Sequence, residues 1–203
     1  MSRIVIVART RMHGDHLCIG GHDLGRKFRG VRLLDRFGDH WPSDSPFLVG
    51  ELWDMHYLEK ASARPPHVED VCVMEYRRMG QAEDLKGLVL QHVQPWIGAP
   101  EVLFDGTARS TGSGAAYIPT RGRLPRCSTG YWIPNEDLVQ QILRERVRFA
   151  TTGESAIKRF AWVGVQRPPE RIETGALVRM SLSRLFSSET APEGYYVQIS
   201  GVL

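Results

Sequence analysis

The hydrophobic pattern of the first part of the chain predicts short strands joined by turns. The continuous apolar run at residues 4–8 has the length of a strand that is buried on both faces. Further apolar runs at residues 31–34, 47–49 and 71–74 are separated by glycines and prolines. Strands this short, without long helices between them, favour a small antiparallel barrel over a doubly wound parallel sheet.

The strand pattern returns after Val147 with clearer alternation. At residues 178–183, and again at 195–199, apolar residues alternate with polar ones, as in a barrel wall with one wet face. Residues 160–165 form another strand candidate, followed by proline and glycine turn signals. The last part of the chain therefore predicts a second compact β unit.

Two helices are expected between these β regions. Residues 81–93 place apolar side chains at helical spacing, with acids near the start and Pro95 after the end. The second expected helix covers residues 135–143, with Asn135 as its N-cap and two acids in its first turn.

Length and composition limit the class of protein. With 203 residues, 42% of them hydrophobic, the chain can bury a core without metal or disulfides. Its cysteines, Cys18, Cys72 and Cys127, are odd in number and widely spaced, which indicates a reducing compartment. No apolar run has the length of a signal or membrane-spanning segment. We therefore expect a soluble, cytoplasmic protein with no membrane partner.

The net charge of +3 hides an uneven distribution of charge along the sequence. Residues 51–105 are acidic, whereas residues 106–132 contain four arginines and no acid. Arginine accounts for 22 of the 26 basic residues, and its planar guanidinium binds phosphate in two places. A GC-rich genome enriches arginine without any functional reason, so the bias alone does not decide the function.

The acid-free segment at residues 106–132 suits a flexible, cationic loop. Its arginines lie among Gly, Ser, Thr and Pro, and it ends in Tyr131 and Trp132. Such a loop can hold a nucleic-acid backbone. The alternative is a solvated loop that only keeps the protein soluble. For Trp132, beside the expected helix start, a packing role is favoured.

The order of several short motifs resembles the bacterial dual OB-containing domain family. The motifs are the strand at 4–8, Cys-Ile-Gly-Gly at 18–21, Gly-Val-Arg at 30–32, residues 65–70, residues 128–134, Leu-Ser-Arg at 182–184 and Tyr-Tyr-Val at 195–197. The resemblance spans essentially the whole chain. It implies a mainly β fold of two OB-like barrels joined by a helix and loop insertion, with barrels at 1–80 and 147–203 and a bridge at 81–146. It also implies a nucleic-acid-related role, although OB barrels bind proteins and sugars too.

We therefore predict a protein that binds nucleic acid through arginine–phosphate contacts, without cofactor and without chemistry of its own. Single strands are slightly favoured as the ligand, DNA or RNA. The prediction assumes that arginines of the first barrel and of the central loop share one groove. The predicted binding residues are Arg9, Arg11, Arg29, Arg32, Arg109, Arg121, Arg123, Arg126, Tyr131 and Trp41, with Arg26 and Lys27 nearby in the first barrel.

Two other functions and two further candidate sites remain open. A protein-interaction module of a bacterial multi-component system would make the basic loop incidental. A metal-dependent nuclease or nucleic-acid modification enzyme would use His67, Glu69 and Asp70, with Glu51 or Asp54 as a further ligand, although a structural turn is favoured there. A zinc site would use the cluster His13, Asp15, His16, Cys18 and His22, although ordinary loop histidines are favoured. Cys127, beside Arg126, is the best candidate for a reactive thiol, but no catalytic signature accompanies it.

Overall fold

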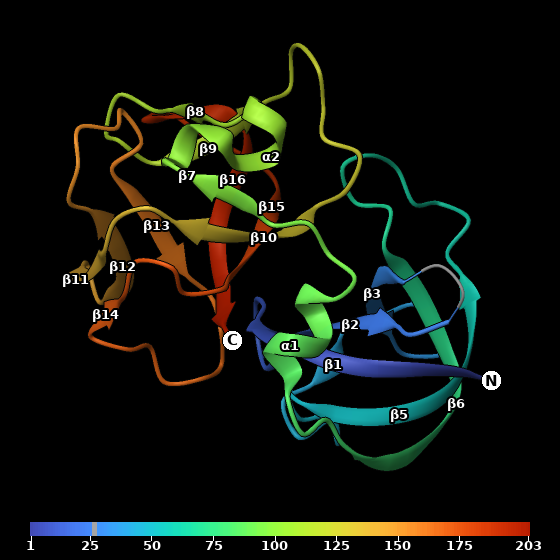
Figure 1. Cartoon of the computed structure of the whole chain (residues 1–203). Helices are drawn as coiled ribbons and strands as arrows, with labels where there is room; N and C mark the ends of the chain where they lie inside the picture. Colours follow the sequence, from blue (N-terminus) through green and yellow to red (C-terminus); the bar gives the residue numbers. More distant parts are fainter. Residues whose placement is uncertain (26–27) are drawn as a thin grey trace. The chain divides into compact units, whose positions relative to one another are not determined.

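A computed structural model describes residues 1–25 and 28–203, so Arg26 and Lys27 lie outside the described residues. The structure is mostly β, which confirms the predicted class (Figure 1). The chain divides into two compact units, Met1–Val93 and Gln94–Leu203, which we call unit 1 and unit 2. Among the described residues no helix is both long enough and apolar enough to cross a membrane.

Unit 1 is a closed barrel. In the described residues its strands are β1 (Ser2–Arg11), β2 (His16–Asp23), β3 (Arg29–Leu34), β5 (Glu51–Glu59) and β6 (Asp70–Gln81), with the short β4 (Trp41–Pro42) beside β2. The barrel order is β1-β2-β3-β6-β5 and back to β1, with β3 and β6 parallel and the other neighbours antiparallel. This order is that of an OB barrel.

The barrel closes because β1 pairs on both sides. Residues 2–5 pair with β5, and residues 4–11 pair with β2 across a bulge between Ile6 and Ala8. The predicted buried strand at residues 4–8 is confirmed, since each of these side chains is at most 2% exposed. An unbroken apolar run is therefore the sequence signature of the closing strand.

Unit 2 repeats this topology within a larger sheet. Its strands are β7 (Trp96–Gly98), β8 (Arg109–Ser110), β9 (Ala116–Pro119), β10 (Thr129–Pro134), β11 (Leu138–Leu143), β12 (Arg146–Thr151), β13 (Arg159–Trp162), β14 (Arg171–Ile172), β15 (Val178–Ser188) and β16 (Ala191–Val202). The run β11-β12-β13-β16-β15 matches β1-β2-β3-β6-β5, with β13 and β16 again parallel. β15 then pairs with β10, the strand that precedes β11.

The predicted helix at residues 135–143 is wrong. β10 and β11 are two strands interrupted at 135–137, and β11 pairs with β12 along its whole length. The acids expected in a helical turn bind loops instead: Glu136 accepts the Thr152 N–H at 2.7 Å, and Asp137 accepts the Thr174 N–H at 2.8 Å. The apolar spacing was compatible with a helix, but pairing with a neighbouring strand decided the conformation.

The other predicted helix is present but shorter. α1 (Leu85–Leu90) begins after Asp84, whose carboxylate accepts the Gly87 N–H at 2.8 Å. The remaining short helices are the 3-10 turn η1 (Pro100–Val102) and α2 (Leu103–Gly106). Of the segment predicted as a bridge, α1 belongs to unit 1, while β7 to β11 belong to the sheet of unit 2.

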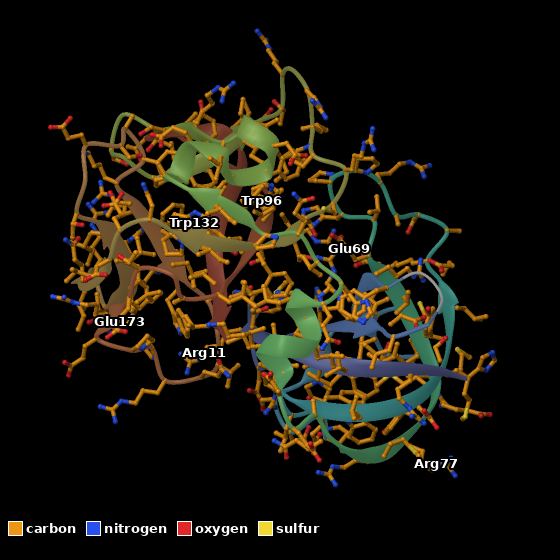
Figure 2. The ribbon with its side chains drawn as sticks, viewed as in Figure 1. Arg11, Glu69, Arg77, Trp96, Trp132 and Glu173 are labelled. Atoms are coloured by element: carbon orange, nitrogen blue, oxygen red, sulfur yellow. The ribbon has the colours of Figure 1, made fainter. Side chains whose placement is uncertain are left out.

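In unit 2, two tryptophans lie close to the backbone of glycine residues, which have no side chain. Trp132 is fully buried, which confirms its packing role, and its indole N–H donates to the Gly98 carbonyl at 2.9 Å. Trp96 lies on the paired strand β7 (Figure 2). A Cβ atom at Gly130 would lie 2.2 Å from Cη2 of Trp96.

Gly130→Ala should therefore destabilise the protein by about 1–3 kcal/mol, because the Trp96 ring must move within a packed core. The measurement is the free energy of unfolding from denaturant titration. Gly112→Ala is the matched control, since a Cβ there meets nothing within 4 Å. Equal stability of the two variants would contradict the packing argument.

Candidate nucleic-acid interface

Two of the predicted arginines of unit 1 are already paired with carboxylates. Arg32 donates from Nε to Asp70, and its side chain is only 11% exposed. Arg29 donates to Glu59 and, at 3.2 Å, to the hydroxyl of Tyr57. Both guanidinium groups therefore carry a neutralised charge, which makes them poor candidates for phosphate binding.

The residues considered for a divalent metal form part of this buried ion network. Arg32 lies beside Asp70 on the neighbouring strand, and its Nη1 is 3.4 Å from Nδ1 of His67. Burial lowers the pKa of Arg32, but nearby Cys18, Asp70 and Glu69 outweigh it and raise that pKa above its ordinary value. A firmly cationic guanidinium at this point opposes a divalent cation.

Neither of the two clusters considered as alternative metal sites assembles among the described residues. Glu51 accepts hydrogen bonds from Arg78 and Trp53, and Asp54 accepts one from Arg3. Within residues 1–25 and 28–203, no group of three or more His, Cys, Asp or Glu could hold a metal ion. This finding includes the described cluster between His13 and His22.

Asp70→Asn should destabilise the protein by about 3–5 kcal/mol, because it leaves the Arg32 charge buried without its carboxylate. The control is Arg77→Gln: its guanidinium lies 3.7 Å from Asp54, the side chain is 69% exposed, and its loss should cost less than about 1 kcal/mol. Denaturant unfolding of the two variants gives both values. A cost for Asp70→Asn no larger than that of the control would show that the network is not structural.

The remaining predicted residues of unit 1 differ in exposure. Arg11 is exposed at the end of β1 and makes no hydrogen bond or ion pair with any described residue. Arg9 donates to the Ser43 carbonyl at 3.1 Å. The half-buried Trp41 packs edge-on against Phe47 and Tyr76, so its ring is part of an aromatic cluster.

Tyr131 is not available to stack on a base. Tyr131 is 3% exposed and lies opposite the buried Arg179 on β15. Burial raises the pKa of Tyr131 to about 12, although the neighbouring Arg179 acts in the opposite direction. The burial of its ring therefore argues against the predicted role of Tyr131 in stacking on a base.

The raised pKa predicts a loss of stability at high pH. The folded protein keeps the Tyr131 proton to about pH 12, whereas the unfolded chain loses it near pH 10, so this contribution to stability is lost as pH rises from 10 to 12. Tyr131→Phe has no proton to lose, and its stability should fall less over that range. The measurement compares the pH dependence of unfolding for the two proteins; parallel curves would contradict the prediction.

The central loop keeps its charge. Arg109 donates to the carbonyls of Gly106 at 2.7 Å and Ala108 at 2.8 Å. Arg121, Arg123 and Arg126, between β9 and β10, are exposed and form no hydrogen bond or ion pair within the described part of the chain. Their role in binding stays a prediction.

Unit 2 presents a further group of arginines that the sequence analysis missed. We call Arg144, Arg146, Arg148 and Arg159 the outer arginine cluster. Phe149 and Phe160 face each other in the core, so alternation places Arg146, Arg148 and Arg159 on the outer face of β12 and β13. Arg148 pairs with Ala161, two residues from Arg159, which makes the two arginines diagonal neighbours.

These arginines repel one another. The pKa of Arg148 is lowered, first by burial and then by the charges of Arg159, Arg146 and Arg144. Glu145 lies on the same turn but forms no ion pair with a described residue. Arg159 donates to the Ser113 carbonyl, a contact that leaves its charge unbalanced.

The turn that presents Arg144 has an unusual backbone. Arg144 and Glu145 join β11 to β12 as a two-residue hairpin turn, with φ values of 51° and 63°. Asparagine and glycine are the usual residues in such a turn. Alternate arginines from this turn into a strand were the missed signal, hidden because residues 133–203 are nearly neutral as a whole.

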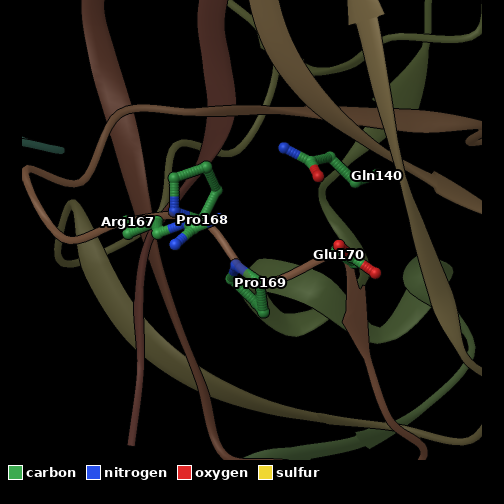
Figure 3. A pocket seen from close by; sticks show the side chains of 5 residues that line it. All are labelled: Gln140, Arg167, Pro168, Pro169 and Glu170. Carbon is green, nitrogen blue, oxygen red and sulfur yellow. The ribbon is translucent and has the colours of Figure 1, made fainter.

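Unit 2 also has a pocket, between β11 and the segment that precedes β14 (Figure 3). Its volume is about 510 Å³, and it is lined by Gln140, Arg167, Pro168, Pro169 and Glu170. The Gln140 N–H donates to the Glu170 carbonyl at 3.0 Å. With one cation and one anion in its lining, the pocket has no charge preference for phosphate.

The topology of both units defines a protein built from two OB-like barrels. The chain belongs to the dual OB-containing domain family, whose model matches residues 2–202, as the sequence resemblance implied.

No curated protein was found to match the chain. Among solved structures, the HINa domain of Ifi202, crystallised with a 20-base-pair duplex DNA, is 8% identical with a TM-score of 0.39; the match covers 98% of this chain and 94% of that one. The tetrameric HIN2 domain of p202 is 7% identical with a TM-score of 0.29; the match covers 97% and 90%. These likenesses are too distant to carry an argument about this chain.

Proposed function

We propose that this protein binds nucleic acid through contacts between arginines and phosphates, and that unit 2 supplies the main binding surface. The observation that supports the proposal most strongly is the outer arginine cluster. Its guanidinium groups crowd together on one sheet face, and no carboxylate of the described residues offsets their repulsion. A polyanion relieves this repulsion and releases its own counterions on binding.

The place of the cluster in the fold supports the same function. β12 and β13 correspond to the second and third strands of an OB barrel, and Arg144 lies on the turn between the first two. The face of strands 2 and 3, with the adjoining loop, is where OB barrels bind oligonucleotides and oligosaccharides. Arginine favours the first of these ligands, because guanidinium and phosphate match in charge and geometry.

The central loop adds to this surface in our proposal. Arg121, Arg123 and Arg126 belong to the same unit and keep exposed, unpaired guanidinium groups. A loop of this kind follows a flexible backbone without reading its sequence. Affinity should therefore depend strongly on salt and only weakly on base sequence.

The triple variant Arg146→Gln, Arg148→Gln, Arg159→Gln should bind labelled DNA or RNA more weakly. The slope of log affinity against log salt should become shallower by about 2–3, because each lost phosphate contact removes about 0.7–0.9. The matched control removes three exposed arginines of unit 1, Arg36, Arg64 and Arg77, and so changes net charge equally. A second triple, Arg121→Gln, Arg123→Gln, Arg126→Gln, tests the loop.

Folding must be checked in the same samples. Arg148→Gln removes a repelled cation, so the first triple should unfold at the same denaturant concentration as the wild type or a higher one. If affinity and salt slope change equally in the cluster triple and in the control, binding is not specific to the outer arginine cluster, and the proposal is contradicted. A wild-type protein that retains no nucleic acid but copurifies with a fixed protein would favour the interaction-module alternative.

A further inference from the structure

Three aromatic side chains lie on the outside of unit 2. On β16, Val197 and Ile199 face the core, which places Tyr196, the residue before Val197, on the outer face. On β9, Ala116 and Ile118 are buried, which places Tyr117 on the outer face in the same way. The third ring belongs to Phe186 near the end of β15, and it is 50% exposed.

The three rings contact one another. Tyr117 and Tyr196 are paired in register, with ring centroids 5.9 Å apart and planes tilted by 30°. Phe186 meets Tyr196 edge to face at 5.6 Å. The hydroxyl of Tyr196 donates to the Pro192 carbonyl at 2.8 Å, which fixes the ring in place. We call Tyr117, Phe186 and Tyr196 the aromatic platform.

A glycine makes room for the platform. Gly194 pairs with Phe186 across the hairpin and with Pro119 on β9. A Cβ atom at Gly194 would lie 2.7 Å from Cδ2 of Tyr117. The Tyr117 ring therefore lies against bare backbone, flat on the outer surface of the sheet.

The platform adjoins the outer arginine cluster. β13 and β9 both pair with β16, where Ala161 lies opposite Gln198 and Tyr117 lies opposite Tyr196. Arg159 also forms a bridge with Ala115, two residues before Tyr117. The outer arginine cluster and the aromatic platform are therefore linked through the segment that leads from Ala115 to Tyr117.

We infer that the aromatic platform stacks unpaired bases, and that the ligand of this surface is a single strand of nucleic acid. The inference rests on the proposed function. When the phosphates of a single nucleic-acid strand contact the arginines, its bases lie over the rings. Each stacked base contributes about 1–3 kcal/mol. In a duplex the base faces are covered by neighbouring pairs, so the platform gives a duplex nothing beyond the phosphate contacts.

The test is the double variant Phe186→Ala, Tyr196→Ala, measured against labelled oligodeoxythymidine and against a mixed-sequence duplex. Affinity for the single strand should fall about 10- to 100-fold, while affinity for the duplex and the salt slope stay unchanged. Tyr196→Phe keeps the ring and should keep the affinity. Phe37→Ala, which removes a 75% exposed ring of unit 1, is the matched control.

The outcomes separate the two claims. Unchanged single-strand affinity in the double variant, with lowered affinity in the arginine triple, overturns the platform and leaves the proposed function standing. Equal losses for single strand and duplex also overturn it. If the wild-type protein binds neither probe at low salt, the proposed function itself fails.

Discussion

The alternation of buried and outward-facing side chains along the strands of unit 2 is the constraint on which the candidate site depends. A small barrel fills its interior with side chains from every second residue of each strand, so the residues between them must face outward. In unit 2, Phe149 and Phe160 occupy the interior and are fully or almost fully buried. Their neighbours Arg148 and Arg159 are therefore held on one outer face, close enough to repel each other. The packing of the core, more than any loop, sets the spacing of the charges.

The two units place arginine side chains in opposite electrostatic surroundings. In unit 1, the parallel strands β3 and β6 place Arg32 beside Asp70, and the charge becomes part of a buried network. In unit 2, the matching parallel strands β13 and β16 place Ala161 beside Gln198, which supplies no carboxylate. Net charge therefore does not predict which arginines are available for binding, since the residue on the next strand decides whether an arginine is paired. A buried ion pair and a cluster of arginines without carboxylate partners arise from one topology.

The sequence predicted the fold better than the site. The buried strand at residues 4–8 and the two β units were recognisable because burial leaves continuous or alternating apolar runs. The expected helix at 135–143 failed because its apolar spacing suits both conformations, and pairing with β12 is not visible in a local pattern. The burial of Tyr131 was not visible for a similar reason: its partner Arg179 lies 48 residues away in sequence, on β15. Arg146 and Arg148 were overlooked because charge was summed over long segments. On a strand, every second residue lies on the same face, so charge must be counted face by face.

The turn at Arg144 and Glu145 lowers the stability of the folded protein. Both residues adopt left-handed backbone angles without being glycine or asparagine, a conformation that disfavours each by about 1–2 kcal/mol. Because only two residues separate the paired strands, the hairpin is stiff. The backbone of Arg144 lies at its tip and cannot move independently of β11 and β12. The backbone of Arg144 is thus fixed before any ligand arrives, so only the rotamer freedom of its side chain remains to be lost there on binding.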